Sequence, residues 1–242
     1  MRFLHKLIFE SKYILSYIMN KLKILLAFIA LILFSSCAVK SSKFQTYLEP
    51  KFQQMNSNLV KNPNIIININ KKIELENRCE QKKSSFIPAL FYWGWNSELE
   101  CEFNKETIEN HLNKFVKQKA EELEIDKMLA NKNLVINLND LPTKLKYQDR
   151  GDLVYLFFFY VLSQKMYIAP ENNMYRGNYY LENNKVKVFE KEFQISNALT
   201  TQKNIFKTPK KISWQYVDFY SKDLENAVTQ ILTEFKNNYK EL

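Results

Sequence analysis

Residues 153–161, LVYLFFFYV, form an unbroken run of apolar and aromatic side chains. A strand that is buried on only one face alternates apolar and polar residues, so a run without a polar position predicts a strand that is covered on both faces. As a helix, the run would extend only about 14 Å, much less than the ~30 Å hydrocarbon core of a bilayer. The run therefore predicts a central strand of a β-sheet.

Further strands are predicted on both sides of this run. Alternating or β-branched residues indicate strands at 64–70, 98–103 and 134–138 before it, and at 174–181 and 186–195 after it. The polar segment between residues 139 and 151 is expected to connect two strands.

The last two strands are predicted to form a hairpin. Asn183 and Asn184 lie between them, and asparagine tolerates the positive φ of a tight hairpin turn. The alternation of apolar residues slips between Val188 and Phe189, which predicts a β-bulge at that point.

Two segments have the apolar periodicity of amphipathic helices. The first runs from an N-cap at Asn104 to about residue 131, and the second from residue 214 or 221 to about 240. Together with the strands they predict an α+β or α/β fold, in which two main helices pack on one mixed sheet of about five to six strands. We expect residues 61–242 to form this single domain.

Two cysteines of the domain, Cys79 and Cys101, are candidates for a disulfide. Antiparallel pairing of 98–103 with the alternating segment 72–80 would bring them together. Two buried thiols or a metal pair are the alternatives, but a metal site needs more ligands, and His111 is the single histidine after residue 37.

The composition excludes some functional classes. From residue 38 onward the chain has 30 basic and 25 acidic residues, a net charge of +5 that is spread along the sequence. Nucleic-acid binding usually shows a concentrated basic patch. The chain has three glycines in all and no Gly-rich phosphate loop, and we predict no cofactor.

The segment 19–37, MNKLKILLAFIALILFSSC, has the features of an export signal. Lys21 and Lys23 precede an uncharged apolar run over 24–34, and two serines then lead to Cys37. The apolar run is shorter than a transmembrane helix, as in signal peptides. An uncleaved anchor helix is the alternative interpretation.

This segment resembles the signal peptide of bacterial lipoproteins. The resemblance implies cleavage after residue 36 and acylation of Cys37, for example by palmitate, which would attach the chain to a membrane of the cell envelope. Ala38 follows the cysteine, which favours the outer membrane over the inner one. Residues 1–18 would then be an over-long start, and 37–60 would be the acylated cysteine followed by a tether.

The aromatic stretch 86–95 is the candidate contact surface. Phe91, Tyr92, Trp93 and Trp95 could fill the core, or they could form an exposed loop that contacts a membrane or a protein partner.

No catalytic motif is present: the chain has neither GxSxG nor HExxH. The order of elements resembles that of small envelope lipoproteins with an α/β domain, which implies action through partners. We expect a non-enzymatic partner-binding or assembly module. The alternatives are a carrier of a lipid or small apolar ligand, with a cavity beside 153–161, and, ranked last, an envelope hydrolase.

Overall fold

The computed structural model describes residues 19, 21, 40–55, 61–73, 76–130, 132–156, 158–196, 202–204 and 208–239. Cys37 and nearly all of the predicted signal peptide lie outside the described residues. The helices and strands are α2 (Ser41–Met55), β1 (Ile65–Ile69), β2 (Arg78–Pro88), β3 (Tyr92–Glu102), α3 (Lys105–Glu122), α4 (Ile125–Leu129), β4 (Asn133–Asp140), β5 (Lys144–Leu156), β6 (Phe159–Pro170), β7 (Met174–Asn183), β8 (Val186–Ser196), β9 (Gln202–Asn204) and α5 (Pro209–Tyr239).

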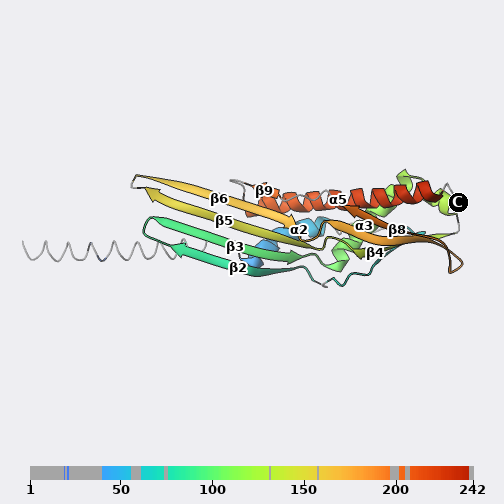
Figure 1. Ribbon diagram of the computed structural model, residues 1–242, viewed down its shortest axis with the longest axis horizontal. Coiled ribbons are helices and arrows are strands. Elements are labelled where there is room, and N and C mark those ends of the chain that lie inside the picture. Colours follow the sequence, from blue (N-terminus) through green and yellow to red (C-terminus); the bar gives the residue numbers. More distant parts are fainter. Residues whose placement is uncertain are drawn as a thin grey trace, which may run out of the picture.

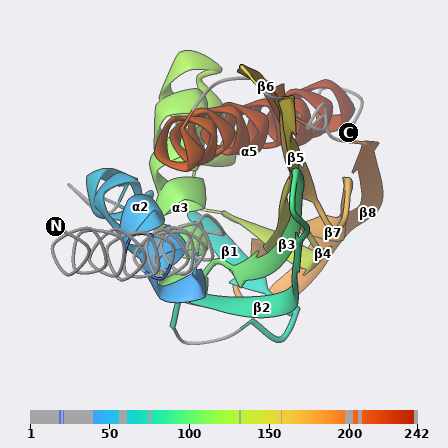
Figure 2. The same cartoon turned by 90° about the vertical axis from the view of Figure 1, so that its left-hand side faces the viewer.

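The strands form two sheets, which corrects the prediction of a single sheet within an α+β fold. One sheet has the order β1-β4-β7-β8, with β1 parallel to β4 and the other pairs antiparallel. The second has the order β2-β3-β5-β6-β9 and is antiparallel throughout. The two sheets lie around the helices α2, α3 and α5, which share one side of the molecule (Figure 2).

The apolar stripes of the helices face the core, as their periodicity predicted. The stripe of α5 is almost completely buried and consists of Leu224, Val228, Ile231, Leu232 and Phe235. The predicted first helix is shorter than expected and ends at Glu122. Glu124 has a positive φ of 57° and separates α3 from the short α4.

A helix replaces part of the expected tether. Residues 41–55 form α2, and Phe44 and Leu48 of this helix are buried in the core. Apolar residues four apart lie on one helix face, so the spacing of these two was a helix signal within a mostly polar segment. The Lys51 ammonium forms an ion pair of 2.8 Å with Asp218 of α5.

Two predictions about strand pairing are confirmed. Cys79 pairs with Cys101 in the β2–β3 hairpin, and the two form a disulfide with an S–S distance of 2.06 Å. The predicted β7–β8 hairpin is present, and its register shift leaves Val188 as the bulged residue. Its turn lies one residue later than expected: Asn183 ends β7, and Asn184 and Lys185 have positive φ.

The run 153–161 is not a central strand. It divides between the end of β5 and the start of β6 and thus forms the far end of a long hairpin. The polar residues before it, predicted as a connection, are the first part of β5, where Leu145 and Tyr147 are buried. The β2–β3 and β5–β6 hairpins lie side by side and project beyond the helices (Figure 1).

Candidate functional site

The turns of the two long hairpins meet at the same end of the molecule. Strands β3 and β5 are antiparallel neighbours, with Tyr92 opposite Val154. The backbone N–H of Tyr155 donates to the carbonyl of Phe91 over 2.9 Å, which joins the two turns. We call the described residues 86–93, 153–156 and 158–162 the hairpin tip.

The hairpin tip exposes large apolar side chains to an unusual degree. The described part of the chain has 16 exposed large hydrophobic residues, and 11 of them lie here. Phe158 is 98 % exposed and Leu90 is 81 % exposed. The other nine are Ile87, Phe91, Tyr92, Tyr155, Leu156, Phe159, Tyr160, Val161 and Leu162. Contiguous exposed apolar patches mark sites of interaction with proteins, membranes or ligands.

Both faces of the sheet are apolar in the hairpin tip. Directly opposed residues of neighbouring strands share a face, so the strand register assigns each side chain. One face presents Phe86, Trp93, Leu153, Tyr155, Tyr160 and Leu162. The opposite face presents Ile87, Tyr92, Val154, Leu156, Phe159 and Val161. In the described part of the chain, a single layer of sheet therefore extends from the body of the protein without a core on either side.

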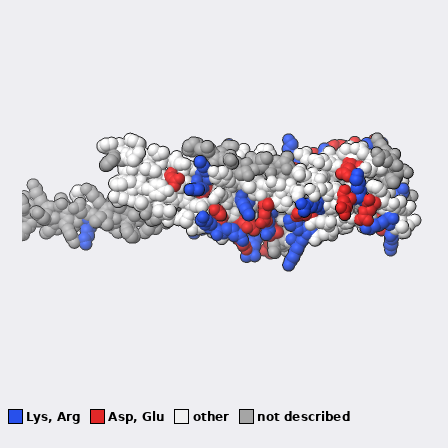
Figure 3. Space-filling model, viewed as in Figure 1, with Lys and Arg blue, Asp and Glu red and all other residues white. Residues whose placement is uncertain are grey.

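Charged residues stop at a rim behind the hairpin tip. The sequence has no charged side chain from 84 to 97 or from 153 to 164. Asp152, which accepts a hydrogen bond from the Tyr92 hydroxyl, lies at the rim, and Arg150 and Lys165 face each other just behind it. Figure 3 shows the same division, with charges over the middle and far end of the molecule and few at the tip.

A buried polar cluster separates the hairpin tip from the core. Asp149 is 1 % exposed and accepts hydrogen bonds from Trp95 Nε1 over 3.1 Å and from Gln164 Nε2 over 3.0 Å. The Trp95 indole lies against Gly151, where an added Cβ would come within 2.1 Å of the ring. These contacts fix the base of the tip from three strands.

The four predicted contact residues fall into two groups. Phe91 and Tyr92 are exposed in the hairpin tip, and Trp93 is half-buried beside them. Trp95 belongs to the base, where it is bound to Asp149. Sequence reasoning missed residues 155–162 as a contact surface, because an unbroken apolar run is typical of a buried strand.

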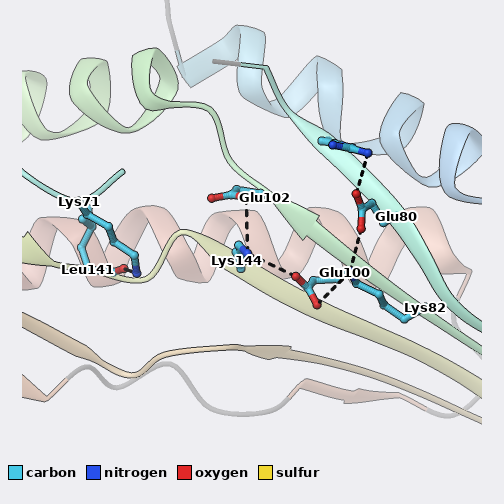
Figure 4. A network of polar contacts seen from close by, with 8 residues as sticks. Lys71, Glu80, Lys82, Glu100, Glu102, Leu141 and Lys144 are labelled. Carbon is cyan, nitrogen blue, oxygen red and sulfur yellow. Dashed lines mark hydrogen bonds and ion pairs between the residues drawn. The ribbon is translucent and has the colours of Figure 1, made fainter. Parts of the chain in front are cut away.

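A charged network covers the outer face of β2, β3 and the start of β5 (Figure 4). Lys82 contacts Glu80 at 2.7 Å and Glu100 at 3.9 Å, and Lys144 contacts Glu100 at 3.5 Å and Glu102 at 3.7 Å. With Arg78, which pairs with Glu80, the network has three basic and three acidic residues. Its charges neutralise one another within a partly exposed sheet face, so we interpret the network as structural.

His111 is a packing residue. It is only 3 % exposed, its ring stacks on Phe115 with centroids 5.5 Å apart, and neither ring nitrogen has a hydrogen-bond partner among the described residues. Burial, together with the nearby positive charge of Lys114, lowers the pKa of His111 to about 4. The sequence predicted that His111 lies on the flank of the apolar stripe, whereas in the structure its side chain on α3 is buried.

The low pKa of His111 is expected to lower the free energy of unfolding by up to about 3 kcal/mol as the pH is lowered from 6.5 to 4. In this range His111 takes up a proton in the unfolded chain and stays neutral in the folded one, so acid favours the unfolded chain. Urea unfolding at several pH values measures the effect. His111→Leu should remove most of it, and an unchanged pH dependence in this variant would contradict the assignment.

Other classes of site find no support in the described residues. Within the ranges given above, no group of three or more His, Cys, Asp or Glu side chains is placed to hold a metal ion. Among the helices of the same ranges, none combines the length and apolarity needed to cross a bilayer.

Comparison with protein-family models, with curated proteins and with solved structures finds no match for this chain.

Proposed function

We propose that this protein is a bacterial envelope lipoprotein that is anchored through acylated Cys37, in the outer membrane rather than the inner one, and acts as a non-enzymatic binding module. The hairpin tip is its binding surface. The observation that supports this proposal is the cluster of 11 exposed large apolar residues on a layer of sheet that has no core of its own among the described residues.

Exposure of the hairpin tip to water is energetically unfavourable. Leaving an apolar side chain in water rather than burying it costs about 1.5–3 kcal/mol, and the hairpin tip contains many such side chains. The body of the protein, by contrast, buries its apolar residues in one continuous core. A chain that packs its body well and leaves one end uncovered is expected to cover that end with something else.

A carrier function is supported less well. It requires an enclosed apolar space beside residues 153–161, but the described side chains of 155–162 are exposed on both faces of the hairpin.

Two measurements test the proposal. Metabolic labelling with an alkyne analogue of palmitate should mark the wild-type protein but not Cys37→Ser. Cells that express Phe158→Cys or Val186→Cys are then treated with a small charged maleimide that enters the envelope but does not partition into lipid. Val186, in the β7–β8 turn, is 64 % exposed and serves as the matched control.

We expect position 158 to be protected and position 186 to react, because a binding surface in use is covered. Equal reaction at both positions in the cell would overturn the hairpin tip as the binding surface. Absence of label from the wild type would overturn the anchor.

A further inference from the structure

We propose that the partner of the hairpin tip is the lipid bilayer itself, and that the tip inserts into one leaflet of the membrane to which Cys37 is attached. This inference rests on the proposed function and names what the binding surface binds. Four observations favour lipid over a protein partner.

The first is that the hairpin tip is apolar all round. A protein–protein interface typically has an apolar core that is surrounded by a polar rim, whereas here both faces and the end of the sheet carry large apolar side chains. An apolar medium that surrounds the tip on all sides would remove every one of these side chains from water.

The second is the height of the uncharged zone. The uncharged zone of β5 extends four residues from Asp152 at the rim to Leu156 at the end of the strand. The turn extends beyond Leu156. At about 3.3 Å per residue this gives roughly 15 Å. One leaflet contributes about half of the ~30 Å hydrocarbon core, which is also roughly 15 Å.

The third is the direction of α2 relative to the hairpin tip. In α2 the Phe44 ring contacts the Tyr147 ring of β5, with centroids 4.5 Å apart, and Lys51, later in the helix, contacts Asp218. Tyr220, close to Asp218 in α5, donates a hydrogen bond to the carbonyl of Pro142, ahead of β5. The helix therefore starts nearer to the hairpin tip than it ends (Figure 1).

The chain length from Phe44 to Cys37 agrees with this placement. From Phe44 back to Cys37 the chain comprises one helical turn and three more residues. Even if those three residues were fully extended, Cys37 would lie at most about 17 Å from the level of Tyr147. Asp152 is five strand residues from Tyr147, which is also about 17 Å. Acyl chains on Cys37 can thus enter the membrane at the level of the rim, with the uncharged tip below it.

The fourth is a pair of basic residues just behind Asp152 at the rim. Arg150 and Lys165 lie opposite each other on neighbouring strands, immediately behind the uncharged zone. At the level of the membrane surface, both would meet the phosphate groups of anionic lipids. Tyr92, whose hydroxyl donates to Asp152 at the rim, supplies an amphipathic ring of the kind that is enriched at membrane interfaces.

The strand edges limit the depth of insertion. In the described residues β9 pairs with β6 only from Met166 to Ile168, so the outer edge of β6 within the tip has no neighbouring strand. Backbone groups without hydrogen bonds are costly in hydrocarbon. We therefore infer that insertion stops within a single leaflet, with the rim at the level of the head groups.

The test uses the acylated full chain in vesicles of phosphatidylethanolamine and phosphatidylglycerol. The fluorophore NBD is attached at Phe158→Cys or, as control, at Val186→Cys; Cys79 and Cys101 are bonded and do not react. Lipids with bromine on the acyl chains quench a fluorophore in hydrocarbon, and aqueous iodide quenches one in water.

At position 158 we expect strong quenching by the brominated lipids and little by iodide, with the reverse at position 186. Iodide quenching at 158 equal to that at 186 would overturn insertion. If position 158 were nevertheless protected from maleimide in cells, a protein would cover the hairpin tip, and the proposed function would stand without this inference. Reaction at 158 in cells would overturn both.

Discussion

Replacing Leu90 and Phe158 together by aspartate is expected to shift the equilibrium between inserted and free hairpin tip by more than about 100-fold toward the free state. Burial of each original side chain contributes about 1.5–3 kcal/mol, so their loss removes at least about 3 kcal/mol. A factor of ten corresponds to 1.4 kcal/mol. Each new carboxylate adds a further cost in the apolar region.

NBD at Val161→Cys in the acylated chain reports this change as a loss of quenching by brominated lipids. The matched control is Val186→Asp with Val188→Asp, which changes two exposed apolar residues of the β7–β8 hairpin. Both double variants should unfold in urea like the wild type, because substitutions at such exposed positions usually change stability by less than about 0.5 kcal/mol. Persistent lipid quenching in the Leu90/Phe158 variant would show that these residues do not hold the tip in the membrane.

Gly177→Ala is expected to lower the free energy of unfolding by about 3 kcal/mol or more, a large share of the roughly 5–15 kcal/mol by which native domains are stable. Gly177 lies in β7 between β4 and β8. A Cβ there would be 1.9 Å from the backbone carbonyl oxygen of Asn137 and 2.9 Å from the Phe193 ring. The carbonyl belongs to the neighbouring strand, so relief requires the sheet to open.

Gly94→Ala provides the comparison, since its Cβ would meet the flexible end of the Tyr92 side chain instead of backbone. We expect this variant to lose less than about 1 kcal/mol. Urea unfolding followed by circular dichroism measures both, and equal midpoints for the two variants would refute the close approach at Gly177.

Elements with strong local signals were predictable from the sequence. The helical stripe of α5, the β7–β8 turn at Asn184 and the Cys79–Cys101 bond follow from periodicity, turn chemistry and antiparallel pairing. Each depends on residues close in the chain or on one simple pairing.

The hairpin tip could not be predicted in the same way. Its β5–β6 turn falls within a run of apolar and aromatic residues and lacks the Gly, Pro, Asn or Asp that normally mark a turn. An apolar run indicates that a segment avoids water but not what covers it. In β5, the inward-facing Asp149 also broke the alternation that identifies a strand. Its partners Trp95 and Gln164 come from the two neighbouring strands, and only the tertiary structure shows them.

The measurement that tests the central claim most directly is photo-crosslinking in living cells from a photoreactive amino acid at position 158, with position 186 as control. The crosslinked protein is purified and its mass determined. We predict an adduct with a membrane lipid at 158 and none at 186. An adduct with another protein at 158, and no lipid adduct, would contradict insertion of the hairpin tip into the bilayer.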